Sequence, residues 1–183
     1  MDNHRTMPEL QAALAAVGTS PSDGGKLEMI VRRPDIDQRE IVDTANLDLV
    51  EGLVGDNWRA RSSSATDDGS ANLDAQIAII NSRVIQALTR DRSRWALAGD
   101  QLFVDIDLST DNLPPGQRLS IGSAVLEITD VPHTGCAKFT ERFGHDAIRL
   151  VNSPQGRESR WRGIYARVVQ AGTISTGDIV RKC

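Results

Sequence analysis

The sequence lacks the marks of several broad classes of protein. It contains no apolar run of eighteen or more residues, so we expect no membrane span and no membrane partner. Its first residues show neither the basic start nor the apolar stretch of a signal peptide, which favours a cytoplasmic protein. Cys-x-x-Cys, His-Glu-x-x-His, phosphate-loop and dinucleotide-binding motifs are absent, and no repeat or heptad pattern is present.

Cysteine is scarce, because the chain holds only Cys136 and Cys183. Two cysteines, one of them the last residue, argue against a disulfide-stapled secreted scaffold. They are also too few for an iron–sulfur cluster. The length of 183 residues fits one domain with a real core, and 39% hydrophobic with 25% charged residues is typical of a soluble globular protein.

Charge is distributed unevenly along the chain. The net charge of −4 argues against a general nucleic-acid binder. Residues 132–167, however, contain seven Lys and Arg residues and only three Asp and Glu residues. The net charge of this segment is therefore +4, and that of the rest of the chain is −8. A basic segment in an acidic protein indicates an anionic ligand of limited size. Arginines paired with neighbouring acids on a solvated surface would explain it equally well.

The hydrophobic pattern predicts a chain that is mainly β with a few short helices. Strands are expected at residues 26–32, 40–43, 76–80, 102–108, 119–121, 124–131, 164–170 and 173–181. Helices are expected at residues 7–17, 83–89, 139–143 and 145–151.

The connections between these elements carry turn residues. We expect a linker at 18–25, a turn-rich loop at 52–58, a mobile loop at 62–71 and a break at 153–156. The last two strands are expected to pair with each other through Ala171 and Gly172. Several short strands with turn signals indicate a barrel or a sandwich, because strand–helix alternation is too irregular for a doubly wound sheet.

Cys136 is the most informative residue. It lies in the sequence Pro-His-Thr-Gly-Cys-Ala-Lys-Phe at 132–139, and Arg142 follows six residues later. A thiol on a glycine-preceded loop beside Lys138 and Arg142 matches a reactive thiolate, since nearby cations stabilise the ionised sulfur. A thiolate is also a soft ligand that suits a transition metal. The plain alternative is a small, buried structural cysteine.

An ordered set of motifs resembles the MOSC domain family, which is named after the C-terminal domain of molybdenum cofactor sulfurases. The motifs lie at residues 52–56, 99–102, 115–122, 125–129, 133–139, 162–168 and 172–178. By this resemblance the chain is identified as a standalone, bacterial-type member. Residues 26–183 would form the MOSC-like β-barrel domain and residues 1–25 an N-terminal extension with a short helix and a linker. Asp100 and Gln101 depart from the family's Glu and Asn.

The resemblance implies a MOSC-type β-barrel that binds the molybdenum cofactor, molybdopterin, with Cys136 as the metal ligand. Some members reduce N-hydroxylated compounds, so the chain is expected to be a molybdenum-dependent oxidoreductase component acting on such small molecules. The alternative is a sulfur carrier, with a persulfide on Cys136, or a cofactor-delivery module without turnover of its own. A third reading is a barrel that has lost the cofactor and serves as an interaction module.

The resemblance also implies particular partners. The anionic pterin is one partner, and a separate protein would supply electrons or sulfur. Pyridoxal phosphate is not expected, because the chain is too short for the aminotransferase-like domain found in some relatives.

Three cations near the cysteine motif are candidates for binding the phosphate of the pterin. Arg142 and Arg162 each offer a planar fork to phosphate oxygens, and Lys138 offers a point charge. Asn152 could donate to a pterin carbonyl, although a helix cap is the simpler explanation. The candidate catalytic residues are Cys136 and His133. His133 could move a proton or lie beside the metal. A loop histidine bonded to backbone is its alternative.

Four further residues have weaker signals. Asp56 is expected to cap a turn, with a hydrogen bond from substrate as the alternative. Trp161 and Tyr165 could form the walls around a flat ligand, but aromatic residues in strands are usually core. Arg167 alternates with apolar neighbours on a predicted strand, so we expect it on the barrel surface.

Overall fold

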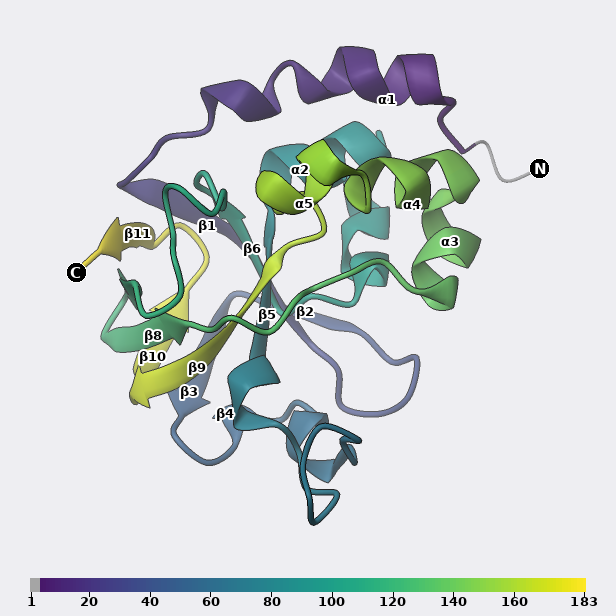
Figure 1. Cartoon of the computed structure of the whole chain (residues 1–183). Helices are drawn as coiled ribbons and strands as arrows, with labels where there is room; N and C mark the ends of the chain where they lie inside the picture. The colour runs from purple at the N-terminus through teal and green to yellow at the C-terminus, as the bar shows by residue number, and fades with distance from the viewer. Residues whose placement is uncertain (1–3) are drawn as a thin grey trace.

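Seven strands close into a β-barrel within residues 4–183, the part of the chain that the computed structural model describes (Figure 1). Their order around the barrel is β11-β7-β8-β9-β5-β6-β1, and pairing of β1 with β11 closes it. The strands are β1 (Gly25–Arg32), β5 (Ile77–Asn81), β6 (Leu102–Asp105), β7 (Arg118–Ile121), β8 (Ala124–Ile128), β9 (Ile164–Gln170) and β11 (Ile179–Lys182). The barrel is mixed, because β5 and β6 run parallel while the other neighbours run antiparallel. The predicted mainly-β barrel is therefore confirmed.

Four more strands extend this frame. β2 (Glu40–Val42) continues the sheet beyond β1, and β10 (Gly172–Ser175), β3 (Thr44–Asp48) and β4 (Gly52–Leu53) form a small sheet of their own. The sequence pattern did not predict β3, and the turn-rich loop expected at 52–58 contains β4 and the 3-10 helix η2 (Trp58–Ala60).

The predicted pairing of the last two strands is wrong. β9 lies between β8 and β5, while the segment after it divides into β10, which pairs with β3, and β11, which pairs with β7 and β1. One glycine lies at the start of β10 and another lies in the turn between β10 and β11. A Cβ at Gly172 would lie 2.4 Å from the backbone carbon of Ser123, so the chain there passes close against the β7–β8 turn. Gly177 takes a left-handed φ of 98° in the turn between β10 and β11.

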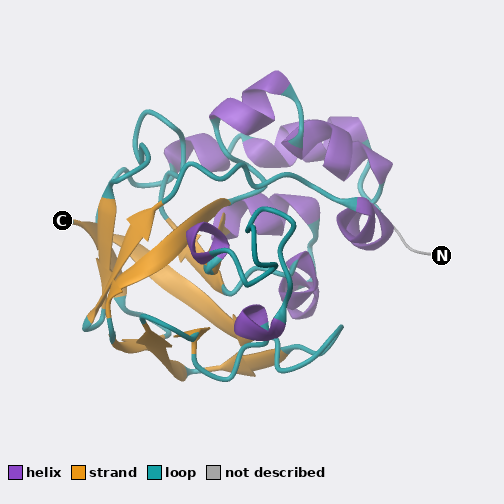
Figure 2. Cartoon of the chain, turned by 60° about the horizontal axis from the view of Figure 1, so that its bottom comes forward, coloured by secondary structure: helices purple, strands orange, loops and turns teal. Residues whose placement is uncertain are grey.

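The helices gather on one side of the barrel, as Figure 2 shows with helices in purple and strands in orange. They are α1 (Met7–Leu14), α2 (Ser82–Leu88), α3 (Ala137–Phe143), α4 (His145–Val151) and α5 (Pro154–Glu158), with 3-10 turns η1 (Val17–Thr19) and η4 (Arg92–Ala98). A further 3-10 turn, η3 (Leu73–Ala75), lies apart from them against β9. α1 packs on α2 and α4 through buried Leu10 and Leu14, so it belongs to this helical layer. The domain boundary near residue 25 stays a prediction.

Two hydrophobic cores share the strands between them. Ile77 and Ile79 of β5 point into the barrel, whereas Ile80 points into the helical layer, where Phe103 and Phe139 also lie. Because both of its faces are covered, β5 is buried along its whole length. This explains why its sequence reads as a continuous apolar run.

Side-chain caps begin one of the predicted helices and one that the sequence analysis missed. Asn81 Oδ1 accepts hydrogen bonds from the backbone of Arg83 and Val84, which starts α2 where the sequence predicts a helix. The break expected at 153–156 is confirmed, because α4 ends at Val151 before it, but the sequence did not predict that α5 begins there. Ser153 Oγ accepts a hydrogen bond from the backbone N–H of Gly156. Pro154 lies in the first turn, where a backbone N–H would have no partner within the helix, so the missing N–H of proline costs nothing there.

No helix among residues 4–183 is long and apolar enough to cross a membrane. Residues 62–71, expected to be a loop, contain no helix or strand.

Candidate functional site

Cys136 lies at the end of the loop that follows β8, directly before α3. Its side chain is exposed and contributes to the wall of a cavity of about 280 Å³. Six cationic side chains line the same cavity: Arg33, Arg39, Arg61, Lys138, Arg142 and Arg162. The alternative of a buried structural cysteine is therefore wrong, and the expectation of a reachable thiol near fixed cations is confirmed.

The loop is braced from the helical layer. The backbone N–H of Gly135 donates to Asn152 Oδ1 at 3.0 Å, and Asn152 Nδ2 lies 3.5 Å from the Gly135 carbonyl. A Cβ at Gly135 would lie 3.0 Å from Ile148, so the loop also packs tightly on α4. Asn152 does not line the Cys136 cavity. Asn152 positions the loop that carries the thiol, and its predicted contact with a pterin stays a prediction.

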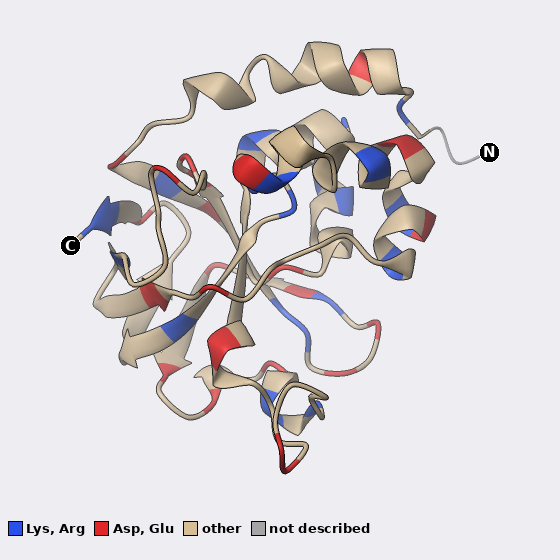
Figure 3. Ribbon diagram, in the orientation of Figure 1, with Lys and Arg blue, Asp and Glu red and all other residues tan. Residues whose placement is uncertain are grey.

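The cations come from two distant parts of the chain. Lys138, Arg142 and Arg162 belong to the basic segment predicted at 132–167, whereas the other three come from the first third of the sequence. Arg149, Arg157 and Arg167 of the basic segment lie outside the cavity lining. Figure 3 shows the β1–β2 loop, which carries blue and red residues, next to α3.

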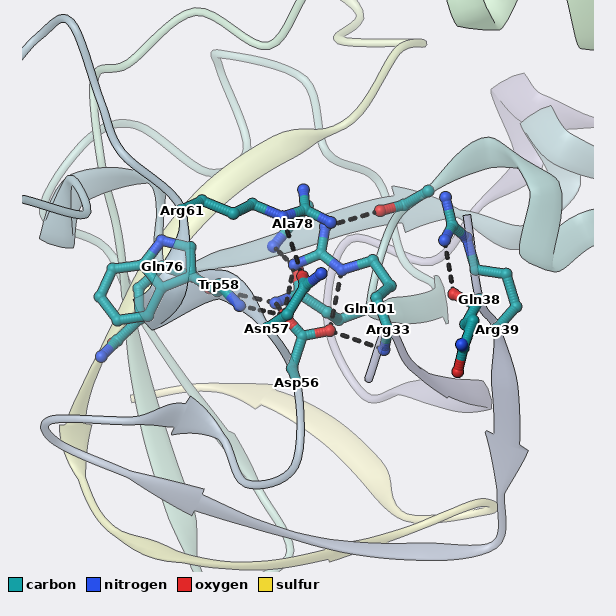
Figure 4. A network of polar contacts seen from close by, with 11 residues as sticks. Arg33, Gln38, Arg39, Asp56, Asn57, Trp58, Arg61, Gln76, Ala78 and Gln101 are labelled. Carbon is teal, nitrogen blue, oxygen red and sulfur yellow. Dashed lines mark hydrogen bonds and ion pairs between the residues drawn. The ribbon is translucent and has the colours of Figure 1, made fainter. Parts of the chain in front are cut away.

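Asp56 organises one wall of the cavity (Figure 4). Its fully buried carboxylate accepts from the backbone N–H, Nε and Nη2 of Arg33 at 2.8, 2.8 and 2.7 Å, and from the backbone N–H of Trp58 at 3.0 Å. The predicted turn cap is confirmed, and the carboxylate has a second task that the sequence did not reveal. Because it balances the charge of Arg33, this arginine is held rigidly in the wall.

Asp100 balances the charge of Arg162 in the same way. Arg162 donates to its carboxylate at 2.8 Å and to the carbonyl of Ala98 at 3.0 Å, and its guanidinium lies 4.9 Å from the centre of the Phe139 ring. Burial raises the pKa of Asp100, while Arg162 opposes that shift. Arg162 is 6% exposed, so this predicted phosphate ligand is largely committed to the wall.

Arg39 and Arg61 line the cavity without a carboxylate partner among the described residues. Arg39 Nε donates to the Ala96 carbonyl at 3.2 Å, and Arg61 Nε donates to Asn57 Oδ1 at 2.8 Å. Within residues 4–183 neither forms an ion pair with a carboxylate. Burial and neighbouring arginines lower the pKa of both side chains, so positive charge is crowded on this wall. The sequence analysis missed both residues, although Arg61 closely follows the family motif at 52–56.

Lys138 and Arg142 stand at the rim with a carboxylate between them. Lys138 Nζ lies 2.9 Å and Arg142 Nη2 3.0 Å from Asp37 Oδ1, and Arg142 Nη1 also donates to the Leu97 carbonyl at 2.8 Å. Both residues line the cavity where the sequence analysis expected them.

His133 forms the floor with Tyr165. The two rings stack with centroids 4.2 Å apart, and His133 Nδ1 lies 3.6 Å from Asp100 Oδ1. Burial, reinforced by Arg162 and Arg33, lowers the pKa of His133 well below its ordinary value of 6.5, so the ring is neutral at neutral pH. Among the described residues Nδ1 has no hydrogen-bond partner, which disagrees with the backbone-bonded alternative. Its role in proton movement stays a prediction.

Of the two aromatic residues considered as walls for a ligand, one lines the cavity and the other does not. Tyr165 lines the cavity, and burial raises the pKa of its hydroxyl. Trp161 is buried in the helical core instead. Arg167 lies on the barrel surface as predicted, half exposed and paired with Glu127.

Comparison with solved structures identifies the fold. The chain is similar to the YuaD protein of Bacillus subtilis, with a TM-score of 0.59 and 17% identity over 85% of this chain and 93% of that one. It is also similar to YiiM of Escherichia coli, with a TM-score of 0.55 and 16% identity over 86% and 69% of the two chains. YiiM of Geobacillus stearothermophilus gives a TM-score of 0.51 and 14% identity over 88% and 73%. No curated protein matches the sequence.

The family model of the MOSC domain matches residues 66–181. This match begins after the motif at 52–56, yet the structure places β1, from the part before the match, in the closed barrel. The matched part contains Cys136 and its loop. The chain therefore belongs to the MOSC domain family, which is associated with binding of the molybdenum cofactor.

Proposed function

We propose that this protein binds the molybdenum cofactor in the Cys136 cavity, with the Cys136 thiolate as a ligand of the metal, and acts as a redox component on small molecules such as N-hydroxylated compounds. The observation that supports this most is the exposed thiol in a cavity with six cationic side chains on its walls. Neither feature alone would distinguish such a site from an ordinary polar surface.

The residues present fit the chemistry of that cofactor. Its dithiolene sulfurs provide soft ligands, so the protein needs to add one thiolate. Among residues 4–183 no group of three or more His, Cys, Asp or Glu side chains is arranged to hold a metal ion, and Cys136 would act as a single protein ligand. The cofactor's phosphate needs cations, which the cavity holds in excess of its carboxylates.

The cations would divide into two groups by their partners. Arg33 and Arg162 are neutralised by buried carboxylates and serve to shape the walls. Arg39 and Arg61 donate only to neutral oxygens, so their remaining N–H groups are the strongest candidates for phosphate oxygens. Lys138 at the rim is a further candidate, together with the nearby Arg142.

When bound, the cofactor would supply the two-electron redox chemistry, with electrons from a separate donor protein. The chain's own residues would hold and orient it. Cys136 would hold the metal at the mouth of the α3 loop, and the neutral ring of His133 would offer a hydrogen bond at the floor. The Tyr165 hydroxyl, whose pKa is raised by burial, would stay protonated and able to donate.

Molybdenum and pterin content test the proposal. We expect gently purified protein to contain both, Cys136→Ala to lose most of the molybdenum, and the matched variant Cys183→Ala to retain it, because Cys183 does not line the cavity. Circular dichroism would verify that both variants fold. Equal molybdenum in Cys136→Ala and wild type would exclude ligation by this thiol. A persulfide on Cys136 in protein without metal would support the sulfur carrier instead.

A further inference from the structure

The loop between β1 and β2 reaches across the cavity rim to α3. Asp37, at its tip, places both carboxylate oxygens on Lys138 Nζ, at 2.9 and 3.2 Å, and one of them 3.0 Å from Arg142 Nη2. The partners lie about a hundred residues further along the chain. Contact with Lys138 lowers the pKa of Asp37, so the carboxylate is ionised at neutral pH.

Apart from Asp37, the loop is joined to the helical layer at its end, where Arg39 Nε donates to the Ala96 carbonyl at 3.2 Å. Of the hydrogen bonds that the described chain forms between residues 34–38 and the helices, all end on the Asp37 carboxylate. Ile36 beside it is 75% exposed, and therefore apolar packing does not hold the tip. Asp37 itself adopts a left-handed φ of 57°, which a non-glycine residue adopts at a cost. Exposed ion pairs stabilise a structure only weakly.

We propose that Asp37 is a built-in anion that occupies the binding site formed by Lys138 and Arg142, and that a phosphate-bearing ligand displaces it and opens the β1–β2 loop. A phosphate carries more negative charge and more acceptor oxygens than one carboxylate, so it would bind Lys138 and Arg142 in place of Asp37. This inference rests on the proposed function to the extent that the ligand is the phosphate-bearing cofactor.

Competition has a measurable consequence for affinity. A ligand that must first displace Asp37 binds more weakly than it would to a site already open. We therefore expect Asp37→Asn to bind inorganic phosphate about fivefold more tightly than wild type in calorimetric titrations at low ionic strength. Asp35→Asn is the matched control, because Asp35 lies in the same loop and its carboxylate accepts from the neighbouring Ile36 backbone. It should bind phosphate as wild type does.

Hydrogen exchange of the loop distinguishes displacement from closure. If phosphate displaces Asp37, the amides of residues 35–38 should exchange faster when phosphate is added to wild type. In Asp37→Asn they should already exchange fast without it. Slower exchange on adding phosphate would mean that the loop closes over the anion, and this would overturn the proposal. Equal or weaker phosphate binding by Asp37→Asn would overturn it too.

Two further variants test where the anion binds. Lys138→Ala and Arg142→Ala should each weaken phosphate binding, and full affinity in both would place the anion elsewhere and refute the proposal.

Failure of the displacement proposal can be distinguished from failure of the proposed function. If no variant binds phosphate while Cys136 still retains molybdenum, only the displacement is wrong. If Asp37→Asn gains affinity while no molybdenum is retained, the anion site stands and the cofactor assignment falls.

Discussion

At the scale of single residues, three carboxylates decide what the cations around Cys136 can do. Asp56 and Asp100 are buried and take up the charge of one arginine each, which turns those arginines into structural parts of the wall. Asp37 is exposed and pairs with cations at the rim. The chemistry available to a ligand therefore depends on which carboxylate faces each cation, and residue type alone does not determine it.

Asp56→Asn should destabilise the protein strongly. The substitution leaves the buried guanidinium of Arg33 without its counter-charge, and removal of one partner of a buried ion pair costs about 3–5 kcal/mol. Urea unfolding should report a lower midpoint with an unchanged slope. Asp35→Asn, which alters an exposed carboxylate near Arg33 in sequence, should leave the midpoint almost unchanged. Equal stability of Asp56→Asn and wild type would refute the structural role of the pair.

The buried, neutral ring of His133 should lower the free energy of unfolding as the pH falls. Burial, Arg162 and Arg33 keep this ring neutral in the folded state, while in the unfolded chain it takes up a proton near its ordinary pKa of 6.5. The unfolded state is thus favoured increasingly as the pH falls below 6.5. We expect the stability difference between wild type and His133→Gln to drop by up to about 1.4 kcal/mol per pH unit between pH 6.5 and 5.5. Asp100 and Tyr165 also face the ring and remain present in both proteins.

Urea unfolding at pH 7.5, 6.5 and 5.5 measures that difference. A difference that stays constant over this range would mean that the histidine has similar proton affinity in both states. An NMR titration of the ring would decide independently, since the folded protein should show no protonation at pH 6.5.

At the scale of elements, the thiol's position depends on a contact between two short helices and a loop. The loop that ends at Cys136 begins after β8, and α4 is followed by its C-cap residue Asn152, whose amide holds the loop at Gly135. Short helices are weak structural units on their own. Their tertiary contacts therefore set where the sulfur lies.

Asn152→Ala should loosen the Cys136 loop. It removes the acceptor of the Gly135 N–H, for which we expect a loss of about 1 kcal/mol in unfolding free energy. Hydrogen exchange at Gly135 should accelerate, and molybdenum retention should fall. Asn152→Asp keeps an acceptor oxygen at the same place and should preserve protection of that amide. Unchanged protection in Asn152→Ala would show that Ile148 packing, rather than the amide, holds the loop.

At the scale of the whole molecule, barrel closure brings the two halves of the chain together at the cavity. Arg61 comes from the segment that follows the small sheet, whereas Cys136 and the rim cations come from the helical layer. Neither half contains the complete site.

Arg61→Gln should therefore weaken binding of inorganic phosphate about tenfold, because a charge-assisted hydrogen bond is lost from a crowded cationic wall. Arg167→Gln is the matched control, since it removes the same charge from the barrel surface and should leave phosphate affinity unchanged. Calorimetric titration compares the two. An equal loss in both would indicate only a general effect of net charge.

The sequence by itself determined the β-rich class, most strand and helix positions and the family, and it pointed to Cys136 as the candidate site residue. These depend on local information: alternation within a strand, a cap such as Asn81 at a helix start, and short ordered motifs. The sequence did not separate β10 from β11, because the strands with which they pair are distant in the sequence.

Only the tertiary structure decided which charges belong to the site. Four of the seven cations in the basic segment lie outside the cavity, and Arg39 and Arg61 enter it from elsewhere. It also gave Asp37 its place on Lys138. The physical reason is that an electrostatic site depends on distances of a few ångströms, and in a closed barrel those distances join residues far apart in the sequence.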